Sequence, residues 1–339
     1  MKDFSVSFAD IKAMITEFHG ALSHVGIAAQ ERQAHLVKPK GSLGRLEILA
    51  EWISTWQGHH PPTMKDVGVR VFAANHGVVV HGVSAYPAEV TAKMVEIFQK
   101  GGAAINQLCH NADADLRIHA FSPSMPTDDF TQGPAMSQEA CCQALAVGME
   151  MVDDGLDLLC LGEMGIGNTT SASALCCALF GGATRDWIGA GTGIDAAGLA
   201  RKEKAIIKAL EVNNITQSQD PLHILQCLGG YEIAALVGAI ISARRKSIPV
   251  LLDGFVTTAA ASVLFKYDPH ALDHCLVAHR SAEQAHGNLL TILDKEPLFD
   301  FAMRLGEGSG AALAIPVIRG AIACHTKMLT FEEAGITAA

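Results

Sequence analysis

The sequence predicts an α/β protein in which a parallel sheet is flanked by helices and a small helical domain is formed by both ends of the chain. Apolar runs at residues 69–74, 158–161 and 249–252 each lead into a glycine-containing turn and then a helical stretch. Strands that read as continuous apolar runs are buried on both faces, and strands separated by helices make a parallel sheet. A further strand is expected at Trp187 and Ile188, before the turn 189–193.

Helical spacing at the two ends predicts the small domain. An amphipathic stretch covers residues 7–36, and Ser42 is placed to cap a second helix that runs to Trp56. Helical spacing returns after Ala311, so we expect this tail to pack with the N-terminal helices. The predicted division is 1–60 and 311–339 for the helical domain and 61–310 for the large α/β domain.

The composition excludes several classes of protein. The chain carries a formal charge of −10, which disfavours a nucleic acid or an anionic membrane as partner. It has no apolar span of transmembrane length and no signal-peptide pattern at its start. Its nine cysteines include no Cys-x-x-Cys, which is typical of reduced thiols in the cytoplasm, where we expect the protein to act.

The turn 162–170 carries the first chemical signal. It reads Gly-Glu-Met-Gly-Ile-Gly-Asn-Thr-Thr and lies between a predicted strand and a helical run. Backbone N–H groups at such a helix start can bind a phosphate. The turn matches neither a Walker loop nor a dinucleotide fingerprint, and a turn needed only for strand-to-helix packing is the alternative. Three further glycine-rich turns in the same topological place favour a nucleotide site.

Single carboxylates at the predicted strand ends are candidates for acid–base chemistry. Glu307 lies between glycines in the segment 306–310 and is the first candidate for a general base. The alternative is an acid that stabilises a helix N-terminus. Asp253 and Glu163 end two of the predicted strands. They could hold Mg²⁺, but no Asp-rich motif accompanies them, and we expect no metal or other cofactor.

The histidines raise the possibility of a zinc hydrolase. His270 and His274 are four residues apart, and His279 and His286 follow. No His-Glu-x-x-His is present, so surface or supporting roles are the favoured interpretation. His76 is expected to line a pocket without binding metal.

Taken together, the ordered motifs resemble those of nicotinate-nucleotide:dimethylbenzimidazole phosphoribosyltransferases, over about residues 30 to 320. The matching segments are 38–47, 75–78, 82–87, 90–91, 101–106, 162–170, 249–255, 281–283 and 304–314. The resemblance implies a homodimer with a Rossmann-like large domain. It also implies transfer of the phosphoribosyl group of nicotinate mononucleotide to 5,6-dimethylbenzimidazole, giving α-ribazole 5′-phosphate and nicotinate, in cobalamin lower-ligand synthesis.

The resemblance also assigns site residues. Glu307 matches the general base, with Glu163 as a second catalytic residue. Glu163, Lys202 and Ser281 match positions near the ribose phosphate. The remaining predicted substrate-binding residues are Gly165, Gly167, Asn168, Thr169, Gly191, Thr192, Asp253, Gly254, Phe255, His76, Ser84 and Tyr86. Asn75 and Tyr86 depart from the common family pattern, which bears on the acceptor base: a purine or a phenol is the alternative acceptor, and a non-catalytic nucleotide-binding module is the alternative from another class.

Overall fold

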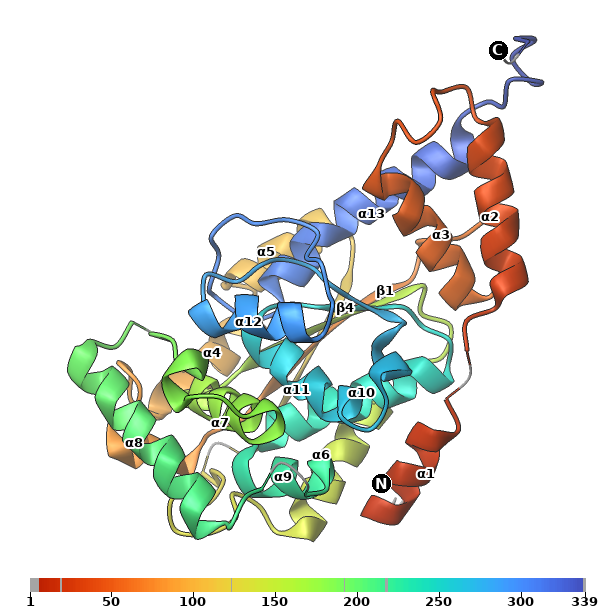
Figure 1. The fold of residues 1–339 in the computed structure, drawn as a ribbon. Helices are drawn as coiled ribbons and strands as arrows, with labels where there is room; N and C mark the ends of the chain where they lie inside the picture. The colour runs from red at the N-terminus through yellow and green to blue at the C-terminus, as the bar shows by residue number, and fades with distance from the viewer. Residues whose placement is uncertain (1–5, 19, 123, 192, 217–218, 338–339) are drawn as a thin grey trace.

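In a computed structural model, which describes residues 6–18, 20–122, 124–191, 193–216 and 219–337, five described strands form one parallel sheet (Figure 1). The order across the sheet is β2-β1-β3-β4-β5, and every neighbouring pair is parallel. This is a doubly wound order, so the predicted parallel sheet flanked by helices is confirmed. The strands are β1 (Val67–Ala73), β2 (Asp115–Ala120), β3 (Leu158–Met164), β4 (Val250–Leu252) and β5 (Cys275–Val277).

Helices connect the strands and cover both faces of the sheet (Figure 1). None of those in the described part of the chain is long and apolar enough to cross a lipid bilayer. The α-helices are α1 (Phe8–Thr16), α2 (Ser23–His35), α3 (Arg45–Gln57), α4 (Glu89–Gln99), α5 (Ala104–Asn111), α6 (Gln138–Glu150), α7 (Asn168–Phe180), α8 (Ala196–Val212), α9 (Pro221–Leu228), α10 (Tyr231–Arg245), α11 (Phe255–Phe265), α12 (Gln284–Ile292) and α13 (Ser309–Lys327). Short 3₁₀ helices are η1 (Gly77–His81), η2 (Thr184–Trp187) and η3 (Pro269–Leu272).

The sheet separates two apolar cores. Leu159 and Leu161 of β3 point into the core formed with α6, α7, α9, α10 and α11. Leu158 and Cys160 of the same strand point into the opposite core, with α3, α5 and α13. Neighbouring side chains of a strand point to opposite faces, so a strand that is apolar at every position must be buried on both sides. This burial on both faces explains why the apolar run in the sequence predicts β3.

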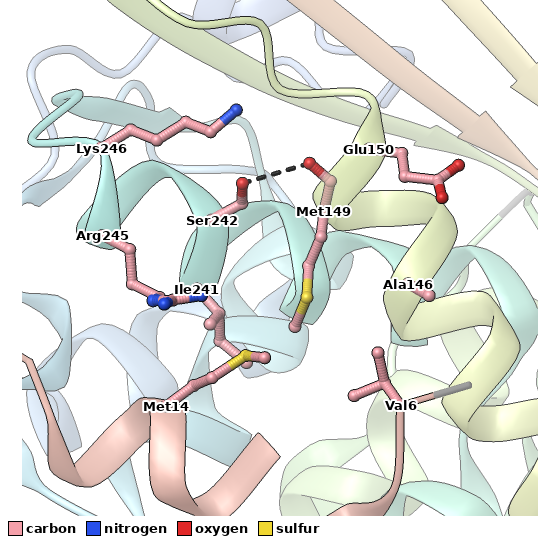
Figure 2. Close-up of a pocket in the computed structure, with 9 residues that line it drawn as sticks. All are labelled: Val6, Met14, Ala146, Met149, Glu150, Ile241, Ser242, Arg245 and Lys246. Carbon is pink, nitrogen blue, oxygen red and sulfur yellow. Dashed lines mark hydrogen bonds between the residues drawn. The ribbon is translucent and has the colours of Figure 1, made fainter. Parts of the chain in front are cut away.

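The first helix packs apart from α2 and α3 (Figure 1). Ile11 and Ile15 of α1 are buried in the core that contains α6 and α10. Beside this contact, α1, α6 and α10 enclose a cavity of about 420 Å³, lined largely by apolar side chains such as Met14 and Met149 (Figure 2). In it the Ser242 hydroxyl donates a hydrogen bond of 3.1 Å to the Met149 carbonyl oxygen (Figure 2).

Three expectations about the N-terminal half and the turn at 189 are wrong. Residues 7–36 form two helices, α1 and α2, with a break that includes Gly20. Helix α3 begins at Arg45 behind a Gly44 cap, because Ser42 is part of a preceding turn. Trp187 ends the 3₁₀ helix η2, where its indole N–H donates to Gly181 O at 2.7 Å.

Two strands, β2 and β5, were not predicted. They lie at the two edges of the sheet. The β2 segment Asp-Leu-Arg-Ile-His-Ala alternates polar and apolar residues and is partly exposed, and β5 has three residues. Edge strands need not carry the long apolar run that marks a central strand.

Candidate active site

A cavity of about 490 Å³ lies at the carboxyl ends of β3, β4 and β5. Ligands bind at this end of the strands in open α/β sheets. Segments from six parts of the chain meet there, and parallel strands contribute by bringing their following turns to one edge. The lining residues are Tyr86, Val90, Met94, Glu163, Met164, Gly165, Ile166, Asn168, Thr169, Gly191, Gly254, Phe255, Val256, His279, Ser281, Glu283, Arg304, Leu305, Gly306 and Glu307.

The turn after β3 approaches other backbone segments closely. A Cβ atom on Gly162 would overlap the backbone nitrogen of Gly308, and one on Gly165 would lie 2.7 Å from the Ala74 carbonyl oxygen. Gly167 has φ +98° and forms the N-cap of α7. These glycines therefore let the start of α7, at Asn168 and Thr169, lie on the cavity wall, where the Asn168 N–H donates to Gly165 O at 3.1 Å. The predicted phosphate-binding geometry depends on this arrangement.

Glu307 lies in a left-handed turn on the cavity wall. Its φ is +64°, its two neighbours are Gly306 and Gly308, and its N–H donates to Glu163 O at 3.1 Å. The side chain is 4% exposed, and Oε2 has no hydrogen-bond partner among the described residues. Burial raises the pKa of this carboxyl group above its usual value. A carboxylate held in this way can accept a proton from a bound ligand.

Asp253 anchors the same turn from behind. Its carboxylate accepts N–H hydrogen bonds from Gly308 at 3.2 Å, Gly310 at 2.6 Å and Ala311 at 3.1 Å. Burial raises its pKa to about 7, although these N–H groups act in the opposite direction. Asp253 is 1% exposed and is not part of the cavity wall, so it positions Glu307 rather than touching the cavity.

Glu163 is the second acid in the cavity. Asn168 donates its side-chain amide to Glu163 Oε2. Burial, followed by the negative charges of Asp253 and Glu232, raises the pKa of Glu163 to about 8. At neutral pH this group is therefore largely protonated and can donate a hydrogen bond, whereas its ionised form adds negative charge to the site.

Lys202 of α8 lies behind Thr169, which lines the cavity, and is not itself part of the cavity wall. It is fully buried, and Nζ donates to Thr169 Oγ1 at 2.9 Å and to Gly189 O at 3.1 Å. Burial lowers its pKa to about 8, and the charge of Glu283 counteracts this shift. Of the basic residues in this stretch, Arg201 is exposed and points elsewhere, to Gly82 O. The contact with Thr169 places the Lys202 ammonium group next to the first turn of α7.

The other predicted residues divide into three groups. Gly191, Gly254, Phe255 and Ser281 line the cavity. His76 and Ser84 line a neighbouring hollow, and Tyr86 lies on the wall of both. Thr192 lies outside the described residues.

His76 has partners of its own. Its Nε2 lies 2.6 Å from Glu232 Oε1 and its Nδ1 lies 3.0 Å from Ser171 Oγ, and all three residues are buried. This chain of contacts crosses the space behind the 165–167 turn, since a Cβ on Gly165 would lie 3.3 Å from Glu232 Oε1. His76 thus supports the turn from behind.

Three functional candidates were not singled out from the sequence as site residues. His279, Glu283 and Arg304 all line the cavity. Arg304 also donates to Gly191 O at 2.9 Å, which fixes the turn after η2. Glu283 and Arg304 fall within motifs of the resemblance, and that was the signal that could have identified them. No spacing rule distinguishes them from ordinary loop residues.

The histidines do not converge on a metal. The side chain of His270 is 82% exposed, whereas His274 is fully buried with Nε2 next to Ile240 O at 3.2 Å. Within the described residues, no group of three His, Cys, Asp or Glu side chains has a metal-binding arrangement. These histidines therefore give no support to a zinc hydrolase.

The fold and the cavity define an α/β enzyme whose cavity is lined by glycine-containing turns and buried carboxyl groups. Residues 21–336 match the DBI_PRT family, described as phosphoribosyltransferase, and the chain belongs to this family. The nicotinate-nucleotide–dimethylbenzimidazole phosphoribosyltransferase of Methylocella silvestris is 51% identical, over 96% of this chain and 95% of its own. That of a Ruegeria species is 50% identical, over 98% of each chain.

A solved structure agrees with these sequence matches. The crystal structure of the corresponding phosphoribosyltransferase from Thermus thermophilus superposes with a TM-score of 0.85 at 37% identity, covering 93% of this chain and 99% of that one. The similarity therefore extends over most of the chain and is not confined to the glycine turns.

Proposed function

We propose that the protein transfers the phosphoribosyl group of nicotinate mononucleotide to 5,6-dimethylbenzimidazole. The products would be α-ribazole 5′-phosphate and nicotinate, and the reaction would supply the lower-ligand nucleotide of cobalamin. The observation that carries the proposal is the buried carboxyl group of Glu307, which faces the cavity without a partner on Oε2 among the described residues. The names of the relatives at about half identity support the choice of substrates.

The phosphate of the mononucleotide fits the start of α7. The positive end of the helix dipole attracts an anion, and the buried ammonium group of Lys202 lies against Thr169 in that first turn. Binding the phosphate there would hold the sugar in the cavity above β3 and β4. Fixing the sugar in one orientation supplies a large part of the rate of such a transfer.

The reaction breaks the bond between C1′ and the pyridinium nitrogen of nicotinate. The electron pair leaves with nicotinate, and positive charge develops on the sugar, where nearby carboxylates stabilise it. A benzimidazole nitrogen then forms the new bond to the opposite face of C1′. Its other nitrogen loses the proton to Glu307, which gives a neutral base in the product. No pyrophosphate leaves, so this reaction requires no chelating metal.

Tyr86 is 54% exposed and stands between the main cavity and the neighbouring hollow, where an acceptor base could lie. A purine or a phenol remains the alternative acceptor because the wall there is largely apolar and offers little to select one heterocycle. A non-catalytic nucleotide-binding module would need neither Glu307 nor this second hollow.

We further propose that the protein is a cytoplasmic homodimer with a small helical domain. All nine cysteines are free and eight are buried, which supports a reducing compartment. Arg32 of α2 donates to His325 O of α13 at 2.7 Å, which supports a unit made from α2, α3 and the end of α13. Leu305 on the cavity wall and Val80 on the wall of the neighbouring hollow are both exposed, which supports a protein contact there.

The direct test is incubation of the purified protein with nicotinate mononucleotide and a panel of bases. We expect release of free nicotinate and a product with the mass of α-ribazole phosphate when 5,6-dimethylbenzimidazole is present. Faster release with adenine or p-cresol would assign another acceptor. Tight binding of the mononucleotide with no nicotinate release from any base would favour the binding module.

A further inference from the structure

Glu283 is a buried acid on the cavity wall that the proposed reaction does not use. It follows β5 and occupies the N-cap position of α12, but its side chain makes no capping hydrogen bond. Its backbone N–H donates to Ser281 Oγ at 3.3 Å, and its side chain lines the cavity at 8% exposure. The carboxyl group therefore lies at the cavity wall next to Gly189 and does not bond to the start of its own helix.

The chain makes room for this carboxyl group without giving it a donor. A Cβ atom on Gly189 would overlap Glu283 Oε2, so only glycine leaves the space that this oxygen occupies. Oε2 is buried and accepts no hydrogen bond from any described residue. Lys202 donates instead to Thr169 and to the Gly189 carbonyl oxygen. A buried acceptor with no donor is costly, so a bound ligand is the natural source of one.

The mononucleotide offers few donors. Near neutral pH its phosphate and its carboxylate accept hydrogen bonds, and its pyridinium nitrogen carries no proton. The ribose 2′- and 3′-hydroxyl groups are the donors that remain. A phosphate oxygen against Glu283 would be repelled, whereas a hydroxyl group would satisfy the orphan oxygen.

We propose that the Glu283 carboxylate accepts a hydrogen bond from a ribose hydroxyl group of the mononucleotide and so selects ribonucleotides over deoxyribonucleotides. This assignment rests on the proposed function. It makes Glu283 a specificity-determining residue, and it explains why a carboxylate is placed beside an anion-binding turn, where by charge alone it would oppose binding.

The experiment compares nicotinate mononucleotide with its 2′-deoxy and 3′-deoxy analogues in the wild type, Glu283→Ala and Glu283→Gln. The readout is kcat/KM for each donor with 5,6-dimethylbenzimidazole. For the wild type, kcat/KM should be about 10- to 100-fold lower with the analogue that lacks the contacting hydroxyl group, which is the size of effect expected for a hydrogen bond to a charged group. In Glu283→Ala, kcat/KM should fall little when this hydroxyl group is removed from the donor. In Glu283→Gln, the fall in kcat/KM should be intermediate.

For each variant, kcat/KM with nicotinate mononucleotide is divided by kcat/KM with the deoxy analogue. Comparing this quotient between the wild type and a variant isolates the contribution of the contact. Removing a ribose hydroxyl group also changes the intrinsic reactivity of the sugar, but this change is the same in every variant and cancels. Glu211→Gln, on the exposed face of α8, serves as the matched control and should discriminate like the wild type. If Glu283→Ala does not fold, as judged by circular dichroism, Glu283→Gln alone still gives the ratio.

The outcomes separate this assignment from the proposed function. Transfer by the wild type with equal discrimination in all variants would overturn the role of Glu283 and leave the reaction intact. Such a result would mean that the carboxylate serves only as a counter-charge to Lys202. No nicotinate release by the wild type would overturn the proposed function, and the assignment with it.

Discussion

The N–H group of Glu307 donates a 3.1 Å hydrogen bond to the carbonyl oxygen of Glu163, which joins two acids that are 144 positions apart in the chain (307 − 163). The contact is possible because Gly162 and Gly308 let the two backbones meet without side chains between them. It places the predicted general base beside the turn that we expect to hold the phosphate.

Glu307→Gln should reduce kcat by about two to four powers of ten, because a neutral amide cannot take the benzimidazole proton. The affinity for nicotinate mononucleotide should stay within a few-fold of the wild type. Steady-state kinetics and calorimetric titration measure the two quantities. A variant that retains full turnover would exclude Glu307 as the base.

Lys202→Met should weaken binding of nicotinate mononucleotide by about 10- to 100-fold, since the positive charge that we expect to attract the phosphate to the start of α7 is removed. Burial lowers the pKa of Lys202 to about 8, so in the wild type the ammonium group loses its proton above that pH and the dissociation constant should rise. The pKa of Glu163 is raised to about 8, and its ionisation acts in the same direction.

The two contributions to this pH dependence can be separated. The rise of the dissociation constant between about pH 7 and 9, the range around these two pKa values, should be shallower in Lys202→Met and should vanish when Glu163→Gln is added. Calorimetry at several pH values measures it. A rise of unchanged steepness in the double variant would show that neither group is responsible.

Asp253→Asn should impair catalysis through the Glu307 turn. The N–H groups of Gly310 and Ala311 donate to Oδ1 of Asp253 and that of Gly308 donates to Oδ2, so the NH₂ group of asparagine would face at least one donor from which it cannot accept. We expect a loss of about 1–3 kcal/mol in the free energy of unfolding and a fall in kcat that exceeds any change in mononucleotide affinity. Urea unfolding gives the first quantity. Wild-type kcat in Asp253→Asn would show that the turn keeps its shape without this anchor.

Gly162→Ala should destabilise the fold and separate the two acids. Its methyl group would overlap the backbone at Gly308, and relief requires a shift of β3 or of the 306–308 turn. Overpacking of this kind costs about 1–3 kcal/mol. Gly133→Ala is the control, because a Cβ atom at that position meets nothing within 4 Å. Equal unfolding midpoints for both variants would contradict the close approach.

The central strands and the glycine turns were predictable because their signals are local. An apolar run such as Val250–Leu252 means burial on both faces wherever it lies in the chain, and a glycine turn after it means a helix start at the same sheet edge. The edge strand β2 is polar at alternate positions and therefore lacks this apolar-run signal. At Trp187 and Ile188 a short apolar run predicts a strand, but Trp187 lies in a 3₁₀ helix.

The sequence predicts which residues gather at the site, but it does not predict what each side chain contacts there. The family motifs pointed to Glu307, Glu163 and Lys202, and the structure places all three at or beneath one cavity. Asp253 carried the same sequence signal as Glu163, yet its carboxylate turns toward the backbone of α13. No sequence pattern singles out Glu283. Its distinguishing feature is a buried carboxylate oxygen without a hydrogen-bond donor among the described residues, and this feature depends on the residues that surround it in the fold.

The sequence by itself determined the parallel sheet, the turns that follow its strands and the family. Periodicity, glycine placement and ordered motifs are contained in the order of residues along the chain. Only the tertiary structure decided which carboxyl groups face the cavity, which lysine lies under the α7 turn and which side chains lack a partner. Those properties depend on burial and on contacts between segments far apart in the chain, and no local pattern encodes the dielectric and the donors that surround a group once the chain has folded.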